Sequence, residues 1–299
     1  MRGLATRILL ALAIVPAALG CATPGGRPMS PLAKLEQSMV FVPARYPQGN
    51  WRPAGLAVED VWFEAEDGTR LHGWYCPHEN PKAVVLFAHG NAGNVTHRAD
   101  VLRVLHDQLG VAVLAFDYRG FGRSGGSPDE AGVLQDARAA RKWLAHREGI
   151  RQSDVVLMGR SLGGAVVVDL AAADGARGLI LESTFTSLPE AASEHVSWVP
   201  TKLIMHNRLN SLAKIGNYRG PLLHSHGDAD RVIPFEHGRR LFAAANEPKR
   251  FVTIPGRDHN DPQTPEYYQA LEQFLAGLPR SVSEPAAQAG FTPGARRVQ

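Results

Sequence analysis

The sequence predicts an α/β fold with a mostly parallel central sheet and helices on both faces. From about residue 58 onward, runs of strand-forming residues alternate with amphipathic stretches of helical length. Several of the runs are wholly apolar, as expected for strands that are buried on both faces of a sheet. Such alternation is typical of a parallel sheet with right-handed crossovers, in which working residues gather at the carboxyl ends of the strands.

The predicted elements follow one another in a regular order. Residues 58–77 are expected to form two strands around a turn that contains Asp67 and Gly68. Further strands are predicted at residues 83–88, 111–118, 154–159, 177–183, 221–227 and 250–255, and helices at about 95–109, 129–147, after 161, 234–246 and 265–278. The chain has 299 residues, and a single domain at residues 38–279 accommodates these elements. Residues 280–299 are polar and small, and are predicted to be a disordered tail.

The N-terminus has the pattern of an export signal. Residues 1–20 contain Arg2 and Arg7, then an apolar run at residues 8–19, and no acidic residue. The run is shorter than the roughly 20 residues that span a bilayer. The following Cys21 ends a stretch that resembles a bacterial lipobox, although Ala18 stands where such motifs usually carry Leu. An ordinary signal peptide with an incidental Cys21 is the alternative.

If Cys21 is acylated, residues 21–37 are expected to be a lipid-anchored tether that holds the domain at a membrane, and its stretch ATPGGRPMSP, rich in Pro and Gly, is expected to be flexible. By resemblance to known sorting rules, Ala22 favours the outer membrane, facing the periplasm, over the inner membrane of a Gram-negative host. A soluble periplasmic or secreted protein is the alternative location.

Composition excludes several classes of function. The formal charge is +3, and without the basic residues of the signal the chain is nearly neutral, which argues against a nucleic-acid surface. Only Cys76 remains beside Cys21, so no internal disulfide is expected. The 12 histidines show no metal-binding spacing, and we expect neither a metal nor a cofactor.

A candidate nucleophile lies between a predicted strand and a predicted helix. Residues 159–163 fit the pattern G-x-S-x-G, with Ser161 at its centre. In this context the glycines permit a sharp turn that exposes the serine, and the helix N-terminus favours developing negative charge. The alternative is that Ser161 is only a small polar residue at a turn.

A nucleophilic serine needs a base and an acid, which follow it in the order acid, then histidine, in this kind of fold. His259 follows the last predicted strand and is the expected base; a surface role is the alternative. For the acid, Asp228 and Asp230 follow the strand at 221–227, and Glu182 ends the strand before it. Placement before a helix favours the two aspartates.

The oxyanion that forms during attack requires two backbone N–H donors. One is expected from Leu162, directly after the nucleophile, and the other from Asn91, in the loop after the strand at 83–88. Gly90 and Gly93 allow that loop to turn inward, and an ordinary tight turn is their alternative role.

Six motifs in order resemble the α/β-hydrolase superfamily: FAHGNAGN, FDYRGFGRSGGSP, GRSLGG, LESTFTSL, HGDADRVIP and GRDHND. The similarity runs from about residue 38 to 278. It is greatest to a branch with a short lid that includes depalmitoylases, monoacylglycerol lipases and bacterial serine aminopeptidase-like enzymes. The resemblance implies Ser161 as nucleophile, Asp230 as acid, His259 as base, Asn91 and Leu162 as oxyanion donors, and a short helical lid at about residues 184–219.

The expected activity is hydrolysis of carboxylic esters or thioesters through an acyl-enzyme, with a small-molecule or lipid acyl ester as substrate. A peptidase or amidase is the second hypothesis. The third is a non-catalytic, envelope-anchored binding lipoprotein, against which the complete set of Ser, Asp and His speaks.

Overall fold

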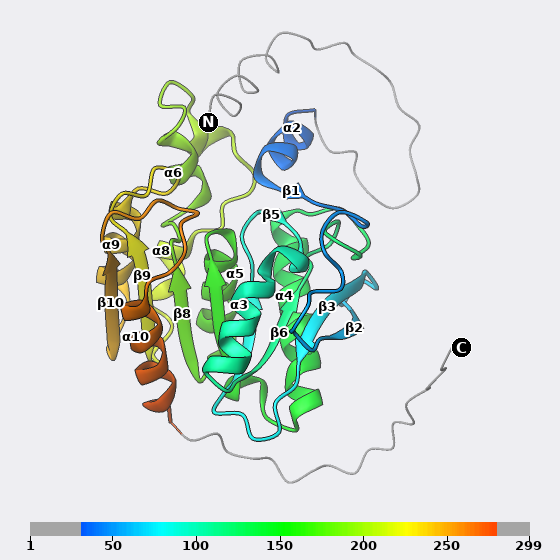
Figure 1. Ribbon diagram of the computed structural model, residues 1–299. Coiled ribbons are helices and arrows are strands. Elements are labelled where there is room, and N and C mark those ends of the chain that lie inside the picture. The colour runs from blue at the N-terminus through cyan, green and yellow to red at the C-terminus, as the bar shows by residue number, and fades with distance from the viewer. Residues whose placement is uncertain (1–30, 280–299) are drawn as a thin grey trace.

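The computed structural model describes residues 31–279. Its centre is an eight-stranded sheet of order β10-β9-β8-β7-β4-β6-β3-β2 (Figure 1). The pairs from β10 to β6 are parallel, whereas β3 is antiparallel to both β6 and β2. The strands are β2 (Glu59–Glu64), β3 (Arg70–Cys76), β4 (Val84–Ala88), β6 (Ala112–Phe116), β7 (Val156–Arg160), β8 (Gly178–Glu182), β9 (Leu222–Gly227) and β10 (Lys249–Ile254). The predicted fold class is confirmed.

Helices cover both faces of the sheet because both faces are apolar. In β4, Leu86 and Ala88 belong to one core cluster, and the alternate residues Val85 and Phe87 belong to the other. One face is covered by α4 (Glu130–Glu148), α5 (Leu162–Asp174), α8 (Ser211–Ile215) and α9 (Phe235–Ala244). The other is covered by η1 (Val95–Arg98), α3 (Ala99–Arg103), η2 (Val104–Gln108) and α10 (Pro265–Ala276). A further short helical turn, η3 (Gln152–Asp154), precedes β7.

Capping residues explain two of the helix boundaries. The side chain of Asp129 caps α4 by accepting a hydrogen bond from Gly132 N, and the helix ends at Gly149, whose φ is 64°. Thr264 caps α10 in the same way, ahead of Pro265 in the first turn. All of the predicted strands and helices occur, with ends shifted by a few residues.

The segment predicted to be a tether differs from the structure in its second half. Residues 31–37 are the beginning of α2 (Pro31–Val40). The Glu36 carboxylate accepts hydrogen bonds from the backbone N–H groups of His206 and Asn207, at 2.9 and 2.8 Å. Pro31 suits a first helical turn, and these long-range bonds, which the sequence does not reveal, hold the helix on the domain. Residues 31–37 therefore belong to a helix that is held on the domain.

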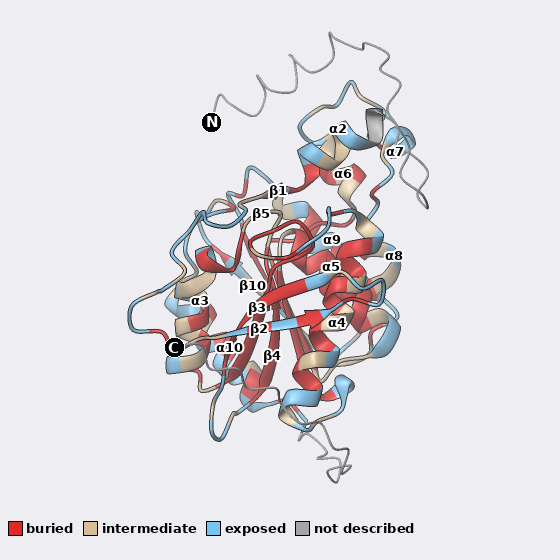
Figure 2. Cartoon of the chain, turned by 90° about the vertical axis from the view of Figure 1, so that its right-hand side faces the viewer, coloured by how far each residue is buried: buried red, intermediate tan, exposed pale blue. Residues whose placement is uncertain are grey.

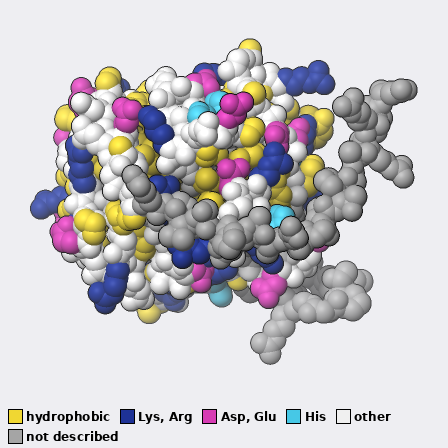
Figure 3. Space-filling view, turned by 90° about the horizontal axis from the view of Figure 1, so that it is seen from below, with side chains coloured by type: hydrophobic (Ala, Val, Ile, Leu, Met, Phe, Trp, Pro, Cys, Tyr) yellow, Lys and Arg dark blue, Asp and Glu magenta, His cyan; other side chains and the backbone are white. Residues whose placement is uncertain are grey.

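The segment predicted as a lid contains α6 (Leu188–Ser193), α7 (Thr201–Ile204) and α8. Figures 1 and 2 show α2 and α6 together at one end of the molecule. The opposite end, seen from below in Figure 3, carries charged side chains of both signs.

The signal at residues 1–20, Cys21, the first part of the tether and the tail at 280–299 lie outside the described residues. Within residues 31–279, no helix has the length and apolar character needed to cross a membrane.

Candidate active site

The candidate nucleophile lies where the direction of the chain through the sheet reverses. β4 lies between β6 and β7 in the sheet, so the chain moves from β4 to the neighbour on one side and then crosses to the neighbour on the other. In open α/β sheets, ligands bind at such a switch point, at the carboxyl ends of the strands. Ser161 follows β7 there, with φ 54° and ψ −118°, a strained backbone conformation for a residue other than glycine. The predicted strand–turn–helix context of Ser161 is therefore present.

The glycines on either side of Ser161 are required by close backbone contacts. A Cβ atom at Gly163 would lie 1.9 Å from the carbonyl oxygen of Ala88, and one at Gly159 would lie 2.3 Å from the carbonyl oxygen of Gly163. Because those neighbours are backbone atoms, they cannot move aside as a flexible side chain could. The motif thus packs the turn at Ser161, which we call the elbow, tightly against the end of β4.

Hydrogen bonds to β8 and its following loop fix the backbone of Ser161. Its N–H donates to the carbonyl of Glu182 at 2.9 Å, and its carbonyl accepts from the Thr184 hydroxyl at 2.7 Å. Leu162 begins α5, so its N–H has no carbonyl one turn back within the helix to bond. That N–H and the positive end of the helix dipole are available to an oxyanion beside Ser161.

His259 and Asp230 come together from the loops after β10 and β9. The Nδ1 atom of His259 lies 2.7 Å from Oδ2 of Asp230, and both side chains are buried. Arg231 and Asp258, the neighbours of the two residues, form an ion pair with Arg231 Nε 2.8 Å from Asp258 Oδ2. The two loops are thus joined both through the acid–histidine bond and beside it.

The other contacts of Asp230 keep its carboxylate charged and oriented. Its Oδ1 accepts hydrogen bonds from the backbone N–H groups of Val232 and Ile233, both at 2.8 Å. Burial raises the pKa of Asp230, but hydrogen bonds from His226 and His259 outweigh it and hold the pKa below its usual range. An ionised carboxylate that accepts from Nδ1 leaves the His259 Nε2 atom free to take a proton.

The two other carboxylates considered from the sequence have different partners. Asp228 is exposed, and its Oδ1 accepts a hydrogen bond from Gly256 N at 2.6 Å. Glu182 is buried, and its Oε1 accepts from the Tyr267 hydroxyl at 2.5 Å. Burial and the adjacent Glu182 charge raise the pKa of Tyr267 well above its usual value, so that hydroxyl remains a donor. Among the described residues, the carboxylate bonded to the His259 ring is that of Asp230.

The loop that contains Asn91 lies against the candidate nucleophile. A Cβ atom at Gly90 would be 3.6 Å from the Ser161 Cβ. The Asn91 side-chain amide donates to the carbonyl of Val40 at 3.0 Å, and the backbone carbonyl of Asn91 accepts from Val42 N at 2.9 Å. The short strands β1 (Val42–Pro43) and β5 (Ala92–Gly93) pair in parallel beside it. The chain after α2 therefore supports this loop, and the backbone of Asn91 is the part left to act as a donor.

Two further residues support the site, and sequence reasoning did not identify them. The Arg160 guanidinium donates to the carbonyl of His259 at 2.5 Å, which links the elbow to the histidine loop. His226 Nε2 lies 2.8 Å from the carbonyl of Ile233 and 3.3 Å from Oδ2 of Asp230. The only signal in the sequence is position: Arg160 precedes the serine, and His226 lies four residues before Asp230.

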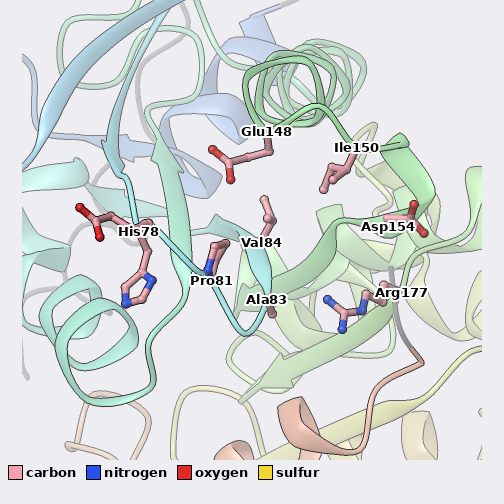
Figure 4. Close-up of a pocket in the computed structure, with 9 residues that line it drawn as sticks. His78, Pro81, Ala83, Val84, Glu148, Ile150, Asp154 and Arg177 are labelled. Atoms are coloured by element: carbon pink, nitrogen blue, oxygen red, sulfur yellow. The ribbon is translucent and has the colours of Figure 1, made fainter. Parts of the chain in front are cut away.

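A cavity of about 300 Å³ lies at the other end of the sheet, near the amino ends of β4, β7 and β8 (Figure 4). Three of its polar side chains are already bonded within the protein: Glu148 accepts from Tyr75, Asp154 pairs with Arg151, and Arg177 donates to the carbonyl of Pro279 at 2.7 Å. We therefore assign it no part in the chemistry. No group of side chains suited to hold a metal ion occurs in the described part of the chain.

Comparisons with known proteins agree with this fold. A family model described as serine aminopeptidase, S33, matches residues 79–216. An uncharacterized protein of Mycobacterium tuberculosis is 39% identical over 245 residues, which is 80% of this chain and 87% of that protein. The alpha/beta hydrolase domain-containing protein WAV2 of Arabidopsis thaliana is 33% identical over 256 residues, or 77% of this chain and 83% of the relative.

Solved structures show the same architecture. The esterase Pf2001 of Pyrococcus furiosus matches with a TM-score of 0.65 and 22% identity, over 80% of this chain and 97% of that chain. At that identity the likeness establishes the fold alone. The two sequence relatives are matched over most of their own lengths, so the similarity extends well beyond the serine motif. The chain belongs to the α/β-hydrolase superfamily.

Proposed function

We propose that the protein is a serine hydrolase that cleaves carboxylic esters or thioesters through an acyl-enzyme on Ser161. The observation that carries this proposal is the bond of 2.7 Å between His259 and Asp230, in loops at the same edge of the sheet as the strained serine. A buried acid–histidine pair at the same sheet edge as a partly exposed serine in a strand-to-helix turn is the arrangement expected for activating a serine hydroxyl.

The proposed reaction follows from these positions. The Ser161 hydroxyl attacks the carbonyl carbon while His259 accepts its proton, and the Asp230 carboxylate stabilises the imidazolium. The backbone N–H groups of Asn91 and Leu162 stabilise the oxyanion. The imidazolium then returns the proton to the leaving alcohol or thiol, and a water molecule, activated by His259, hydrolyses the acyl-enzyme. No cofactor is needed for these steps.

A fluorophosphonate probe tests whether the protein is an enzyme of this kind. We expect stoichiometric labelling of wild-type protein, and its absence would favour the binding lipoprotein. The matched family model, described as a serine aminopeptidase, favours peptidase or amidase activity as the second candidate. A panel of acyl esters, acyl thioesters and aminoacyl amides separates the candidates, and we expect the highest kcat/KM with the esters or thioesters.

The short lid leads to a prediction about acyl chain length. Its helices α6 and α7 span only Leu188–Ser193 and Thr201–Ile204, and Trp198, Leu203 and Ile204 are exposed. Such a lid offers little cover for a long acyl chain, and each further methylene gains at most about 0.8 kcal/mol, only if it is buried. We expect kcat/KM for p-nitrophenyl esters to peak at roughly two to eight acyl carbons. A value that keeps rising to sixteen carbons without detergent would instead indicate a long channel and a lipase or depalmitoylase.

We also propose that Cys21 is acylated and anchors the protein at the cell envelope, with the outer membrane facing the periplasm as the expected location. The support is the apolar run at residues 8–19 that ends at Gly20 and Cys21. Two or more acyl chains give stable anchoring, whereas one is marginal.

Replacing Cys21 by alanine is expected to release the protein into the soluble periplasmic fraction or to leave it as an uncleaved precursor. Wild-type protein should fractionate with membranes and carry the mass of the lipid. Fractionation with immunoblotting, followed by intact-mass measurement, checks both outcomes. Wild-type protein that is wholly soluble and without lipid mass would contradict the anchor.

A further inference from the structure

Most of the large apolar side chains exposed on the described residues lie around the candidate site. Six of these eight define what we call the apolar rim: Met39, Val42, Trp198, Leu203, Ile204 and Val232. The other two are accounted for by ring contacts, since Arg123 lies over Tyr46 and Arg70 lies over Trp62, the latter at 4.0 Å from the ring centroid. Leu203 is 82% exposed and Trp198 is 67% exposed. No ring or cation partner of Trp198 occurs within residues 31–279.

Hydrogen bonds join the apolar rim to the site on both sides. Val232 N donates to the Asp230 carboxylate at 2.8 Å, and the carbonyl of Val232 lies 2.9 Å from His195 Nε2 of the lid segment. Val42 N donates to the carbonyl of Asn91 at 2.9 Å, on the oxyanion side. The rim therefore begins next to the candidate acid and ends next to the candidate oxyanion loop.

A third contact closes the rim between these two sides. The bonds from Glu36 of α2 to the backbone of His206 and Asn207 hold α2 next to the chain that leaves α7. Met39 lies on α2, and Leu203 and Ile204 lie on α7. In Figure 2, α2, α6 and α7 form one protruding group with much exposed surface. Exposed apolar patches mark sites of contact with another protein, a membrane or a ligand.

The occupant is indicated by the sequence that precedes α2. The apolar run at residues 8–19 and Cys21 both lie on the N-terminal side of α2, and Cys21 is ten residues before Pro31. Ten extended residues span at most about 35 Å. If an acylated Cys21 attaches the chain to a membrane, as proposed above, the attachment lies within about 35 Å of the start of α2, the helix that carries Met39 of the rim.

The residues next to the rim also suit a lipid surface. Trp198 is of a type enriched at membrane–water interfaces, and the exposed basic residues Lys34 and Arg208 lie on α2 and the lid segment, where Lys202 is already paired with Glu190 at 3.1 Å. Basic side chains near a membrane surface attract anionic lipid headgroups.

We propose that the apolar rim seats on the surface of a phospholipid bilayer that contains anionic lipid, so that the mouth of the candidate site faces the headgroups. The docking itself does not depend on catalysis. Its consequence does rest on the proposed function: esters carried in the membrane surface reach Ser161 without first entering water.

Tryptophan quenching by lipid tests the docking without any turnover. Full-length protein is mixed with vesicles of equal parts phosphatidylcholine and phosphatidylglycerol, with or without bromine on the acyl chains. The chain has five tryptophans, and we expect Trp198 to account for the bromine-dependent quenching. Trp198→Phe should remove most of it, whereas the matched change Trp62→Phe, on the far edge of the sheet, should leave it unchanged.

Activity against two substrates tests the consequence. The double variant Leu203→Asp with Ile204→Asp is expected to hydrolyse vesicle-loaded p-nitrophenyl octanoate about tenfold more slowly, because it loses buried apolar area at the membrane. Its hydrolysis of dissolved p-nitrophenyl acetate should stay as in wild type, which also shows that it is folded.

The outcomes separate the two proposals. If wild-type protein hydrolyses neither ester but Trp198 is quenched, the proposed function fails and the docking stands. Equal quenching in wild type and Trp198→Phe would overturn the docking. Absence of quenching, together with crosslinks that place a second copy of the chain on the rim, would overturn it as well.

Discussion

Replacing Ser161 by alanine is expected to lower kcat for ester hydrolysis by about 10⁶-fold and to abolish fluorophosphonate labelling. The hydroxyl is the group proposed to form the covalent bond, and the remaining residues cannot form an acyl-enzyme without it. The fold should survive, because the bonds of residue 161 to Glu182 and Thr184 use its backbone and persist with alanine. Probe labelling, steady-state kinetics and thermal unfolding measure the three effects.

A matched serine provides the control for this prediction. Ser183 also has a positive φ, of 44°, and follows the neighbouring strand β8. Ser183→Ala should retain labelling and most of the activity. Labelling that persists in Ser161→Ala but disappears in Ser183→Ala would make Ser183 the nucleophile. Labelling that persists in both variants would place the nucleophile at another residue.

The sheet could be predicted because burial on both faces leaves a strong pattern. β4, β6 and β8 are buried at every residue, and wholly apolar runs between amphipathic stretches are typical of such strands. The order of the strands in the sheet could not be read from these runs. It depends on which way each crossover leaves, and the reversal at β4 places Ser161 beside the loop of Asn91.

The candidate site was predictable where local geometry restricts the residue type. A Cβ atom at Gly159 or Gly163 would lie within 2.3 Å of a backbone atom, so both positions require glycine and the serine between them is conspicuous in the sequence. Local geometry does not determine which of Asp228, Asp230 and Glu182 contacts the histidine. That choice depends on how two loops meet, and the structure gives each carboxylate a different donor.

What could not be predicted depends on contacts between distant residues. α2 is held by bonds between Glu36 and residues about 170 positions away, and these bonds cannot be read from a local pattern. Arg160 reaches the carbonyl of His259, 99 positions away. Contacts of this kind give these segments a structural role: the end of α2 and β1 support the loop of Asn91, and Arg160 links the loop of His259 to the turn at Ser161.

Asp230→Asn is expected to lower kcat by about 10⁴-fold, with a smaller change in KM. Its Oδ1 position is fixed by the N–H groups of Val232 and Ile233, and an asparagine oxygen can keep these bonds. The amide nitrogen must then face His259, where it can only donate. Nδ1 of His259 therefore has to accept, so the proton moves to Nε2, and the ring can no longer take a proton from Ser161. The fold should remain, because the loop bonds of residue 230 remain.

Two matched substitutions make the assignment of the acid falsifiable. Asp228→Asn and Glu182→Gln should each change kcat by less than about tenfold, because an amide oxygen can still accept from Gly256 N or from the Tyr267 hydroxyl. The measurement is kcat and KM for a short p-nitrophenyl ester in the three variants. A large loss in Asp228→Asn with a small one in Asp230→Asn would reverse the two aspartates. A large loss confined to Glu182→Gln would instead move the acid to β8, and since Glu182 bonds Tyr267, that result would require the loop after β10 to adopt another arrangement during catalysis.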